Sequence, residues 1–539
     1  MPRMSTGFPW PKTFPDLGIL NNPAEAELRS LAVADARMTN FGAPVFSTRM
    51  GASSTASGDY LAGAGVRLGR SQRELPPELL HEVLHKVASR MPSLQWISMD
   101  RMMGTSPGRS FHCRLLVPRA FARVAWIWSK LLFPADPARR DPRSAPDFLT
   151  VCFPDWLDGG SQCGRSPERL TLIHPEAGIS YVLGTDRSDE ARVSFFRQAM
   201  HRVKRLGGLG LHAGSKTIWV RDDGDIHECG VLLVGLPGTG KTTLTLEDHR
   251  LAPPESVTVL QDDIVLWSSD GRVCGTEDNF YVRTNGLTRD DQPGLFDALM
   301  CSDSIFENVP VDPAGKIRFA DSARGADGRA VALRSNIPNA GDSIDLARVH
   351  KLILITRHET IMPPLARLTA EQAAAYFMLG ESMGTIAGDS GFQGPPRHQA
   401  GFNPLIIGPE EDEGNRLLEL LRANPETEVC LLNTGSIGKG ADVATDAAFN
   451  LKITKNVSAH LLSFVVRQKA GAQAGWRRDR NWQYEVPIEV PGIPLWKAYT
   501  PSRHYSPSVY ARLVRELLEE RRAWLARFPG LKPEIRNAI

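Results

Sequence analysis

Short apolar runs separated by turn-forming residues recur along the chain, and this pattern predicts buried β-strands. The expected strands are residues 94–98, 111–117, 216–220, 229–234, 257–260, 264–267, 351–356 and 428–432. Two of these runs flank Asp222-Asp223-Gly224, a turn sequence that predicts a hairpin. Beyond residue 215 the strands are separated by helices and loops, so the pattern favours a mixed α/β class.

Helical periodicity is clearest in three segments. Residues 120–132 are expected to form a helix, and residues 508–528 place apolar side chains on one stripe, which indicates packing rather than chemistry. A further helix is expected to begin at Thr369, because Thr369 and Gln372 have the spacing of a capping box. The pattern changes near residues 207–215, so we expect an N-terminal domain over residues 1–210 and a C-terminal domain over residues 211–539.

Composition limits the classes of protein that the chain can be. With 539 residues, the chain is long enough for two or more packed units. A net charge of +2 gives no electrostatic footprint for nucleic acid or for a membrane surface. No run approaches the length of a membrane span, and the N-terminus lacks the apolar stretch of a signal peptide. The seven scattered cysteines favour reduced thiols. We therefore expect a cytoplasmic protein without nucleic-acid or membrane partners; its oligomeric state is open, with a monomer slightly favoured.

The most specific motif is GLPGTGKT, which satisfies the G-x-x-x-x-G-K-[ST] pattern of a phosphate-binding P-loop. Its residues are Gly235, Leu236, Pro237, Gly238, Thr239, Gly240, Lys241 and Thr242, and Thr243 follows. The motif comes directly after the strand-like GVLLV and before a stretch that can open a helix, which is the context it requires. Backbone amides would surround phosphate oxygens, Lys241 would neutralise their charge and the Thr242 hydroxyl would bind Mg²⁺. A chance glycine-rich turn is the alternative.

Two neighbouring carboxylates, Asp262 and Asp263, follow the predicted strand at residues 257–260. Carboxylates at the end of a strand near a P-loop are suited to holding a metal ion bound to a nucleotide. A turn that closes the strand is the alternative explanation.

Several further segments carry a family resemblance. They are Asp278–Arg283 (DNFYVR), Glu307–Val309 (ENV), Ile361–Gln372 (IMPPLARLTAEQ) and Leu431–Gly435 (LLNTG). Together with the P-loop and Asp262-Asp263, these segments make the chain resemble ATP-dependent phosphoenolpyruvate carboxykinase from about residue 35 to residue 530. The resemblance implies a two-domain α/β (mixed α+β) fold with a P-loop nucleotide-binding domain.

The resemblance also implies cofactors and roles. The cofactors are ATP, Mg²⁺ and a second ion, usually Mn²⁺. The implied catalytic residues are Lys241, Asp262, Asp263 and Arg329. Thr242 would hold Mg²⁺, and His212 with Asp263 would hold the second ion. Arg283 stands where the family has a lysine on the γ-phosphate, and Arg334 is an alternative to Arg329 as the phosphate-binding arginine.

The chain departs from the family where the family binds oxaloacetate and completes the second metal site. A metal-binding lysine of the family aligns with Val193, beside Arg192, and a substrate-contacting tyrosine aligns with Arg187. The family's substrate-binding arginine aligns near Ser54 of this chain, and the nearest arginine that could replace it is Arg49. The candidate substrate residues are Arg49, Arg187, Arg192 and Arg334. After Gly435, the family residues that clamp adenine are not recovered.

These departures leave three hypotheses open. The leading one is a metal-dependent phosphotransferase of this family whose acceptor is a small molecule, not necessarily oxaloacetate. The second is a genuine ATP-dependent phosphoenolpyruvate carboxykinase, which converts oxaloacetate and ATP to phosphoenolpyruvate, CO₂ and ADP. The third is a nucleotide-binding protein without catalysis.

Overall fold

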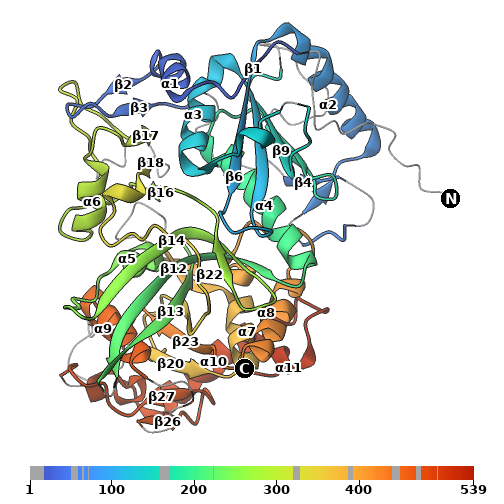
Figure 1. The fold of residues 1–539 in the computed structure, drawn as a ribbon. Helices are drawn as coiled ribbons and strands as arrows, with labels where there is room; N and C mark the ends of the chain where they lie inside the picture. The colour runs from blue at the N-terminus through green and yellow to red at the C-terminus, as the bar shows by residue number, and fades with distance from the viewer. Residues whose placement is uncertain are drawn as a thin grey trace, which may run out of the picture. The chain divides into compact units, whose positions relative to one another are not determined.

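The computed structural model describes the chain in two compact units. The described residues are 17–49, 59–62, 66–70, 72–141, 143–157, 169–222, 224–319, 328–385, 393–439, 450–468, 471, 475–494 and 496–539. Unit 1 comprises Met1–Arg202, Thr276–Pro338 and Leu405–Pro409, and unit 2 comprises Val203–Gly275, Asn339–Pro404 and Glu410–Ile539. Figure 1 follows the chain through both units by colour.

The two units differ from the domains expected from sequence, which met at a single boundary between residues 210 and 211. That boundary falls just inside a strand that begins at Leu209, and residues 276–338 return to unit 1. Sequence patterns are local, so they assign consecutive residues to one domain. The return of the chain to unit 1 at residue 276 has no local sequence signal.

Unit 1 contains a nine-stranded mixed sheet and a five-stranded sheet. The larger sheet consists of β1 (Ile19–Asn21), β6 (Trp96–Met103), β7 (Phe111–Pro118), β9 (Phe148–Phe153), β11 (Ile179–Leu183), β10 (Leu170–His174), β4 (Asp59–Leu61) and β5 (Arg73–Glu74), with β8 (Phe133–Pro134) paired to β6. The smaller sheet has the order β16 (Phe280–Arg283), β18 (Arg329–Ala332), β17 (Ile305–Glu307), β3 (Pro44–Phe46) and β2 (Arg37–Met38). Helices α1 (Glu25–Val33), α2 (Pro77–Arg90), α3 (Ala122–Leu131), α4 (Ser188–Arg205) and α6 (Pro293–Leu299) accompany these sheets.

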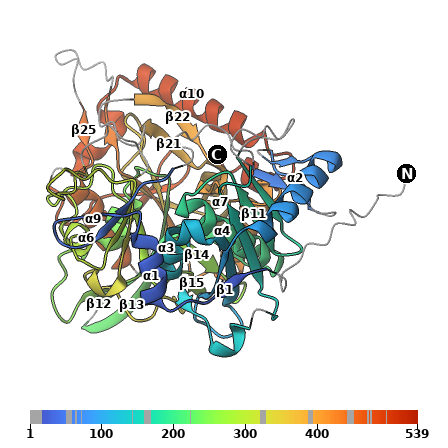
Figure 2. The same cartoon turned by 90° about the horizontal axis from the view of Figure 1, so that it is seen from above.

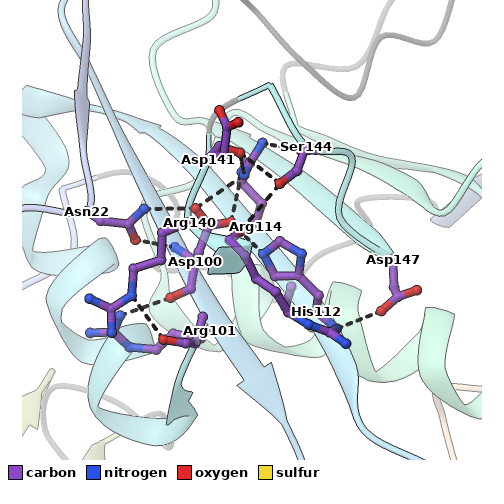
Figure 3. A network of polar contacts seen from close by, with 12 residues as sticks. Asn22, Asp100, Arg101, His112, Arg114, Arg140, Asp141, Ser144 and Asp147 are labelled. Carbon is purple, nitrogen blue, oxygen red and sulfur yellow. Dashed lines mark hydrogen bonds and ion pairs between the residues drawn. The ribbon is translucent and has the colours of Figure 1, made fainter. Parts of the chain in front are cut away.

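The buried carboxylate of Asp100 on β6 binds residues of β7 and the residue that follows β1 (Figure 3). Asp100 on β6 lies 2.8 Å from His112 Nε2 and accepts hydrogen bonds from Arg114 Nε and Asn22 Nδ2, both at 2.8 Å. His112 and Arg114 are on β7, and Asn22 follows β1. Burial raises the pKa of Asp100, but the hydrogen bonds from His112, Arg114 and Asn22 outweigh it and hold the pKa below its usual value. This network is structural, because each member binds another part of the fold.

Unit 2 is built on a second nine-stranded sheet. Its order is β15 (Val273–Gly275), β14 (Ser256–Trp267), β12 (Leu209–Asp222), β13 (Asp225–Gly235), β19 (Lys351–Thr356), β23 (Glu428–Asn433), β20 (Leu365–Leu368), β27 (Glu485–Pro487) and β26 (Trp476–Arg478). Two small hairpins, β21 (Glu381–Thr385) with β22 (Gln393–His398) and β24 (Ser436–Ile437) with β25 (Leu451–Lys452), lie outside it. The helices are α5 (Lys241–Leu246), α7 (Ala370–Leu379), α8 (Glu411–Ala423), α9 (Lys455–Val466), α10 (Pro507–Leu525) and α11 (Pro533–Arg536).

The helix predictions are confirmed. The segment 120–132 forms α3, and α10 covers residues 507–525, preceded by Ser506 as its N-cap. Helix α7 begins after Thr369 with the expected capping box, since Thr369 and Gln372 each bond the other's backbone. Figure 2 shows α10 beside β22, where His398 stacks on Trp524 with ring centroids 4.7 Å apart.

The expected hairpin is confirmed, but the two strands predicted at residues 257–260 and 264–267 are wrong as separate elements. β12 and β13 pair antiparallel down to Asp222 and Asp225. β14 runs unbroken from Ser256 to Trp267, so Asp262 and Asp263 lie inside a strand and not at its end. Sequence polarity marked a break there, yet pairing to β12 continues on both sides of the two carboxylates.

Two further expectations can be compared with the described residues. Within them, no helix is long and apolar enough to cross a bilayer. Six cysteines fall in the described part of the chain and all six are free thiols, as expected, whereas Cys163 lies outside it.

Candidate active site

The loop between β13 and α5 carries the phosphate-binding motif. β13 ends at Gly235 and α5 begins at Lys241. Gly240 has a φ of +94°, a conformation that a residue with a Cβ rarely adopts. Two hydroxyls fix the bend, since Thr239 Oγ1 donates to a carbonyl of the loop at 2.8 Å and Thr434 Oγ1 donates to Thr239 O at 2.8 Å. The backbone amides are therefore held in a bend that can surround a phosphate.

Lys241 and Thr242 both reach Asp262 on the neighbouring β14. Lys241 Nζ lies 3.3 Å from Asp262 Oδ1, and Thr242 Oγ1 donates to Asp262 Oδ2 at 2.8 Å. Lys241 Nζ is also 3.8 Å from Asp263 Oδ1. The ammonium, the hydroxyl and the two carboxylates predicted from sequence are thus brought together at one end of the P-loop.

His212 on β12 completes this group. Its Nε2 lies 2.7 Å from Asp263 Oδ1, and both side chains keep part of their surface exposed, 17% for His212 and 24% for Asp263. Asp263 pairs with Ala213, the residue after His212, so the sheet register brings the two side chains together. Asp263 has a φ of +133°, a strained conformation for a residue other than glycine. Strain of this kind is typical of functional positions.

Close packing holds α5 against β12. A Cβ on Gly214 would lie 2.9 Å from Thr245 Cβ and closer still to its Oγ1. Thr245 lies within α5 and donates from Oγ1 to Lys241 O at 2.9 Å. The small residue at 214 therefore sets how near the helix carrying Lys241 can approach the strand carrying His212.

The expected phosphate-binding arginines belong to unit 1, where one row of residues crosses the smaller sheet. Arg283 on β16 and Arg329 on β18 are direct cross-strand partners, and Glu307 on β17 faces Arg329 from the other side. Like charges directly opposite each other destabilise a sheet. A row with two such arginines is therefore suited to an anion.

Asp189, at the start of α4, links Arg187 to Arg329. Arg187 donates to both carboxylate oxygens of Asp189, at 3.0 and 2.7 Å, and Arg329 lies 3.8 Å from the same carboxylate. Burial raises the pKa of Asp189, but the hydrogen bonds and charge of Arg187 outweigh it and hold the pKa below its usual value. The two arginines are thus brought together by one ionised group.

Arg192 is held by a different acid. Its guanidinium binds Glu277 in a bidentate pair, with Nε–Oε1 at 2.6 Å and Nη2–Oε2 at 2.5 Å, and both side chains are buried. Phe196 and Tyr281 cover the guanidinium at 4.6 and 5.0 Å from their ring centroids. Arg334 donates to Glu277 O at 3.2 Å and to the next carbonyl at 2.7 Å. Arg192 and Arg334 therefore have structural partners.

Arg49 has partners other than those of Arg192 and Arg334. Its side chain is 56% exposed and pairs with Asp35 at 2.5 Å, while its backbone N–H donates to Asp186 Oδ2 at 2.8 Å. The neighbourhood of Ser54 and residues 440–449, which include most of the segment where the family clamps adenine, lie outside the described residues.

Comparison with known proteins decides the family. The model of a family described as phosphoenolpyruvate carboxykinase matches residues 18–495. The chain belongs to that family. It is similar to the phosphoenolpyruvate carboxykinase (ATP) of Aeropyrum pernix, with 35% identity over 436 residues that cover 80% of this chain and 81% of the relative. The corresponding protein of Methylobacterium nodulans is 24% identical over 550 residues, covering 95% and 96%. The two-domain fold and the enzyme class expected from sequence are thereby confirmed.

Carboxykinases of this family use ATP with Mg²⁺ or Mn²⁺, and the residues present fit these cofactors. The oxygens of Thr242 and Asp262 are the hard ligands that Mg²⁺ prefers, and the imidazole and carboxylate of His212 and Asp263 suit Mn²⁺. Among the residues that the structure describes, no group of three or more His, Cys, Asp or Glu side chains gathers as a metal cluster.

Sequence reasoning missed several carboxykinase residues that bind the predicted ones. Asp189 binds Arg187 only two residues away, a local signal that was overlooked, whereas Glu277 binds Arg192 from 85 residues along the chain, too far for a local pattern to reveal. Lys216 lies in a predicted apolar strand, and the sequence assigns it no role. Its side chain is fully buried, and its ammonium binds a carbonyl at the C-terminal end of α5. A charged residue within a predicted buried strand was the available signal.

Proposed function

We propose that this chain is an ATP-dependent phosphoenolpyruvate carboxykinase that converts oxaloacetate and ATP to phosphoenolpyruvate, CO₂ and ADP. The observation that carries the proposal is the joint placement of Lys241, Thr242 and Asp262 with the pair His212–Asp263. A P-loop alone serves many reactions, whereas a metal-binding pair one residue from the Asp262 carboxylate suits a reaction in which a phosphoryl group moves to a second anionic substrate.

The proposed reaction balances with these substrates alone. The C–C bond to the leaving carboxylate breaks, CO₂ departs and the electron pair forms the enolate of pyruvate. The enolate oxygen then bonds to the γ-phosphorus while the bond from that phosphorus to the β-phosphate bridging oxygen breaks, giving ADP. No redox partner is needed, and catalysis consists of positioning and charge stabilisation.

The residues of unit 2 have separable roles in this reaction. The P-loop amides orient the triphosphate, and the Lys241 ammonium neutralises charge that develops on its transferred group. Thr242 and Asp262 would hold Mg²⁺, and His212 and Asp263 would hold Mn²⁺. When bound, these ions supply Lewis-acid stabilisation of phosphoryl and enolate oxygens. Arg283 and Arg329 of unit 1 are proposed to bind phosphate oxygens.

A second candidate function is phosphoryl transfer to another small acceptor. It is favoured by Val193, an aliphatic residue where the family has a metal-binding lysine, and by the neighbouring Arg192, which Glu277 already neutralises. An arginine bound in this way cannot replace a lysine that ligates a metal.

One assay separates the two functions. Purified enzyme is mixed with oxaloacetate, ATP, Mg²⁺ and Mn²⁺, and phosphoenolpyruvate is followed by mass spectrometry. We expect product from the wild type and a loss of at least about 100-fold in kcat for Lys241→Ala. The exposed Lys452→Ala serves as control and should match the wild type. ATP turnover that needs Lys241 but gives no phosphoenolpyruvate would favour the second candidate instead.

A cytoplasmic location and a monomeric state remain predictions for this enzyme. Light scattering of the purified chain at micromolar concentration tests the second of these directly, with the 59.3 kDa mass of one chain as the expected result.

A further inference from the structure

Helix α2 of unit 1 presents an outer face that the catalytic groups do not use. Its residues Leu80, Val83, Leu84 and Val87 are buried and pack into the core of the larger sheet. The other side of the helix is exposed, and in residues 81–85, HEVLH, it carries His81, Glu82 and His85. The buried side fixes the helix, so the exposed side chains project from a rigid element.

His81 and His85 lie one helical turn apart on that exposed face. Residues four positions apart project from the same side of a helix. Their ring centroids are 6.3 Å apart and their planes are tilted by 32°. An ion between two imidazoles lies about 2.0–2.1 Å from each nitrogen, so ring centres about 5–6.5 Å apart can share one ion with small side-chain rotations.

We propose that His81 and His85 chelate a divalent transition metal ion, with water as its remaining ligands. Two imidazoles favour Zn²⁺, Ni²⁺ or Cu²⁺ over Mg²⁺ or Ca²⁺, which prefer oxygen. Once the first imidazole binds, the second does so intramolecularly, so the pair binds more tightly than either residue alone. Both histidines are far in sequence from His212 and Asp263 and belong to a different unit, so this ion is additional to those of catalysis.

The same five residues match the H-E-x-x-H motif of zinc peptidases, but the structure favours a chelating site without catalysis. A peptidase needs a third protein ligand and a glutamate facing the substrate in a cleft. Among the described residues, no cluster of three metal-binding side chains of the His, Cys, Asp and Glu types includes α2.

The test is a calorimetric titration of the untagged full-length enzyme with Zn²⁺. We expect the wild type to bind one more Zn²⁺ than His81→Ala/His85→Ala. The informative control is His85→Ala/Lys86→His, which keeps two histidines but places them five residues apart, on different sides of the helix. It should bind Zn²⁺ at this site at least about tenfold more weakly than the wild type.

A second readout identifies the ligands. One equivalent of Cu²⁺ should give an electron paramagnetic resonance spectrum with two more coordinated imidazole nitrogens in the wild type than in His81→Ala/His85→Ala. Carboxykinase activity and the circular dichroism spectrum should be equal in all variants, because α2 holds no proposed catalytic residue. Equal Zn²⁺ stoichiometry in wild type and double variant, or equal affinity in the shifted-histidine control, would overturn the proposal.

Discussion

Lys216 Nζ lies 2.7 Å from His249 Nε2, within hydrogen-bond distance, at the C-terminal end of the helix that follows the P-loop. The lysine also donates to the carbonyls of Leu244, at 2.5 Å, and Glu247, at 3.1 Å. Because an ammonium only donates, His249 Nε2 accepts, and its Nδ1–H donates to Ala459 O at 3.1 Å. One buried cation thus joins β12, the end of α5 and α9.

This arrangement predicts a pH-dependent stability that Lys216→Met removes. Burial lowers the pKa of Lys216 to about 7, well below that of a lysine in an unfolded chain. Between about pH 7 and pH 10 the unfolded chain keeps a proton that the folded chain releases, so this residue adds to the free energy of unfolding as pH rises. Relative to Lys216→Met, the wild type should gain about 3 kcal/mol between pH 7 and pH 9.5.

Urea denaturation of both proteins at pH 6.5, 8 and 9.5 measures this difference. The exposed strand lysine of Lys452→Met is the matched control and should leave the pH dependence of the wild type unchanged. Parallel curves for the wild type and Lys216→Met would contradict the assignment of the titration to Lys216.

The parts of the site that sequence predicted are those encoded by neighbours in the chain. The P-loop follows from eight consecutive residues, and the capping box of Thr369 from four. In contrast, Asp262 and Asp263 look like the end of a strand because they are polar, although β14 continues through them. β14 continues through the two carboxylates because it pairs with β12, and the sequence of one strand does not reveal which strand it pairs with.

Long-range partners limit what can be predicted about the arginines. Arg192 meets Glu277 across 85 residues of sequence, and Arg123 meets Glu307 across 184. A family resemblance identifies such arginines by their position in the sequence. It does not tell whether a carboxylate of the same chain neutralises them. Sequence therefore locates the charged groups, and the fold decides which ones remain to bind substrate.

The pairing of His212 with Asp263 predicts a change in metal dependence that is separate from nucleotide binding. His212→Ala removes an imidazole that fits Mn²⁺ but leaves Lys241, Thr242 and Asp262 in place. We expect the Mn²⁺ concentration for half-maximal activity to rise at least about tenfold, with Mg·ATP affinity changed less than about twofold.

Activity titrations with Mn²⁺, together with calorimetry of Mg·ATP, provide the two measurements. His227→Ala replaces an exposed histidine on β13 and should behave as the wild type. If His212→Ala weakened both ligands equally, the residues assigned to two separate ions would have to form one site.

Close packing at Gly214 predicts that a single methyl group displaces the P-loop helix. Gly214→Ala would bring Cβ into overlap with Thr245 on α5, and neither backbone can withdraw freely. We expect a loss of about 1–3 kcal/mol in the free energy of unfolding and a lower kcat, because Lys241 moves with α5. The matched substitution is Gly18→Ala, which has no atom within 4 Å of the new Cβ and should affect neither quantity.

The last prediction concerns the buried carboxylate of Asp100. Asp100→Asn leaves Arg114 buried without its ionised partner, so we expect a loss of about 3–5 kcal/mol at pH 7. Because the pKa of Asp100 is lowered in the folded protein, its contribution is present above the unfolded value of 3.8 and is lost as pH falls below it. The gap between wild type and Asp100→Asn should therefore narrow toward pH 3. Denaturation at pH 7, 5 and 3 checks this, with the exposed Asp290→Asn as control. A gap that stays constant over this range would mean that Asp100 contributes through its shape rather than its charge.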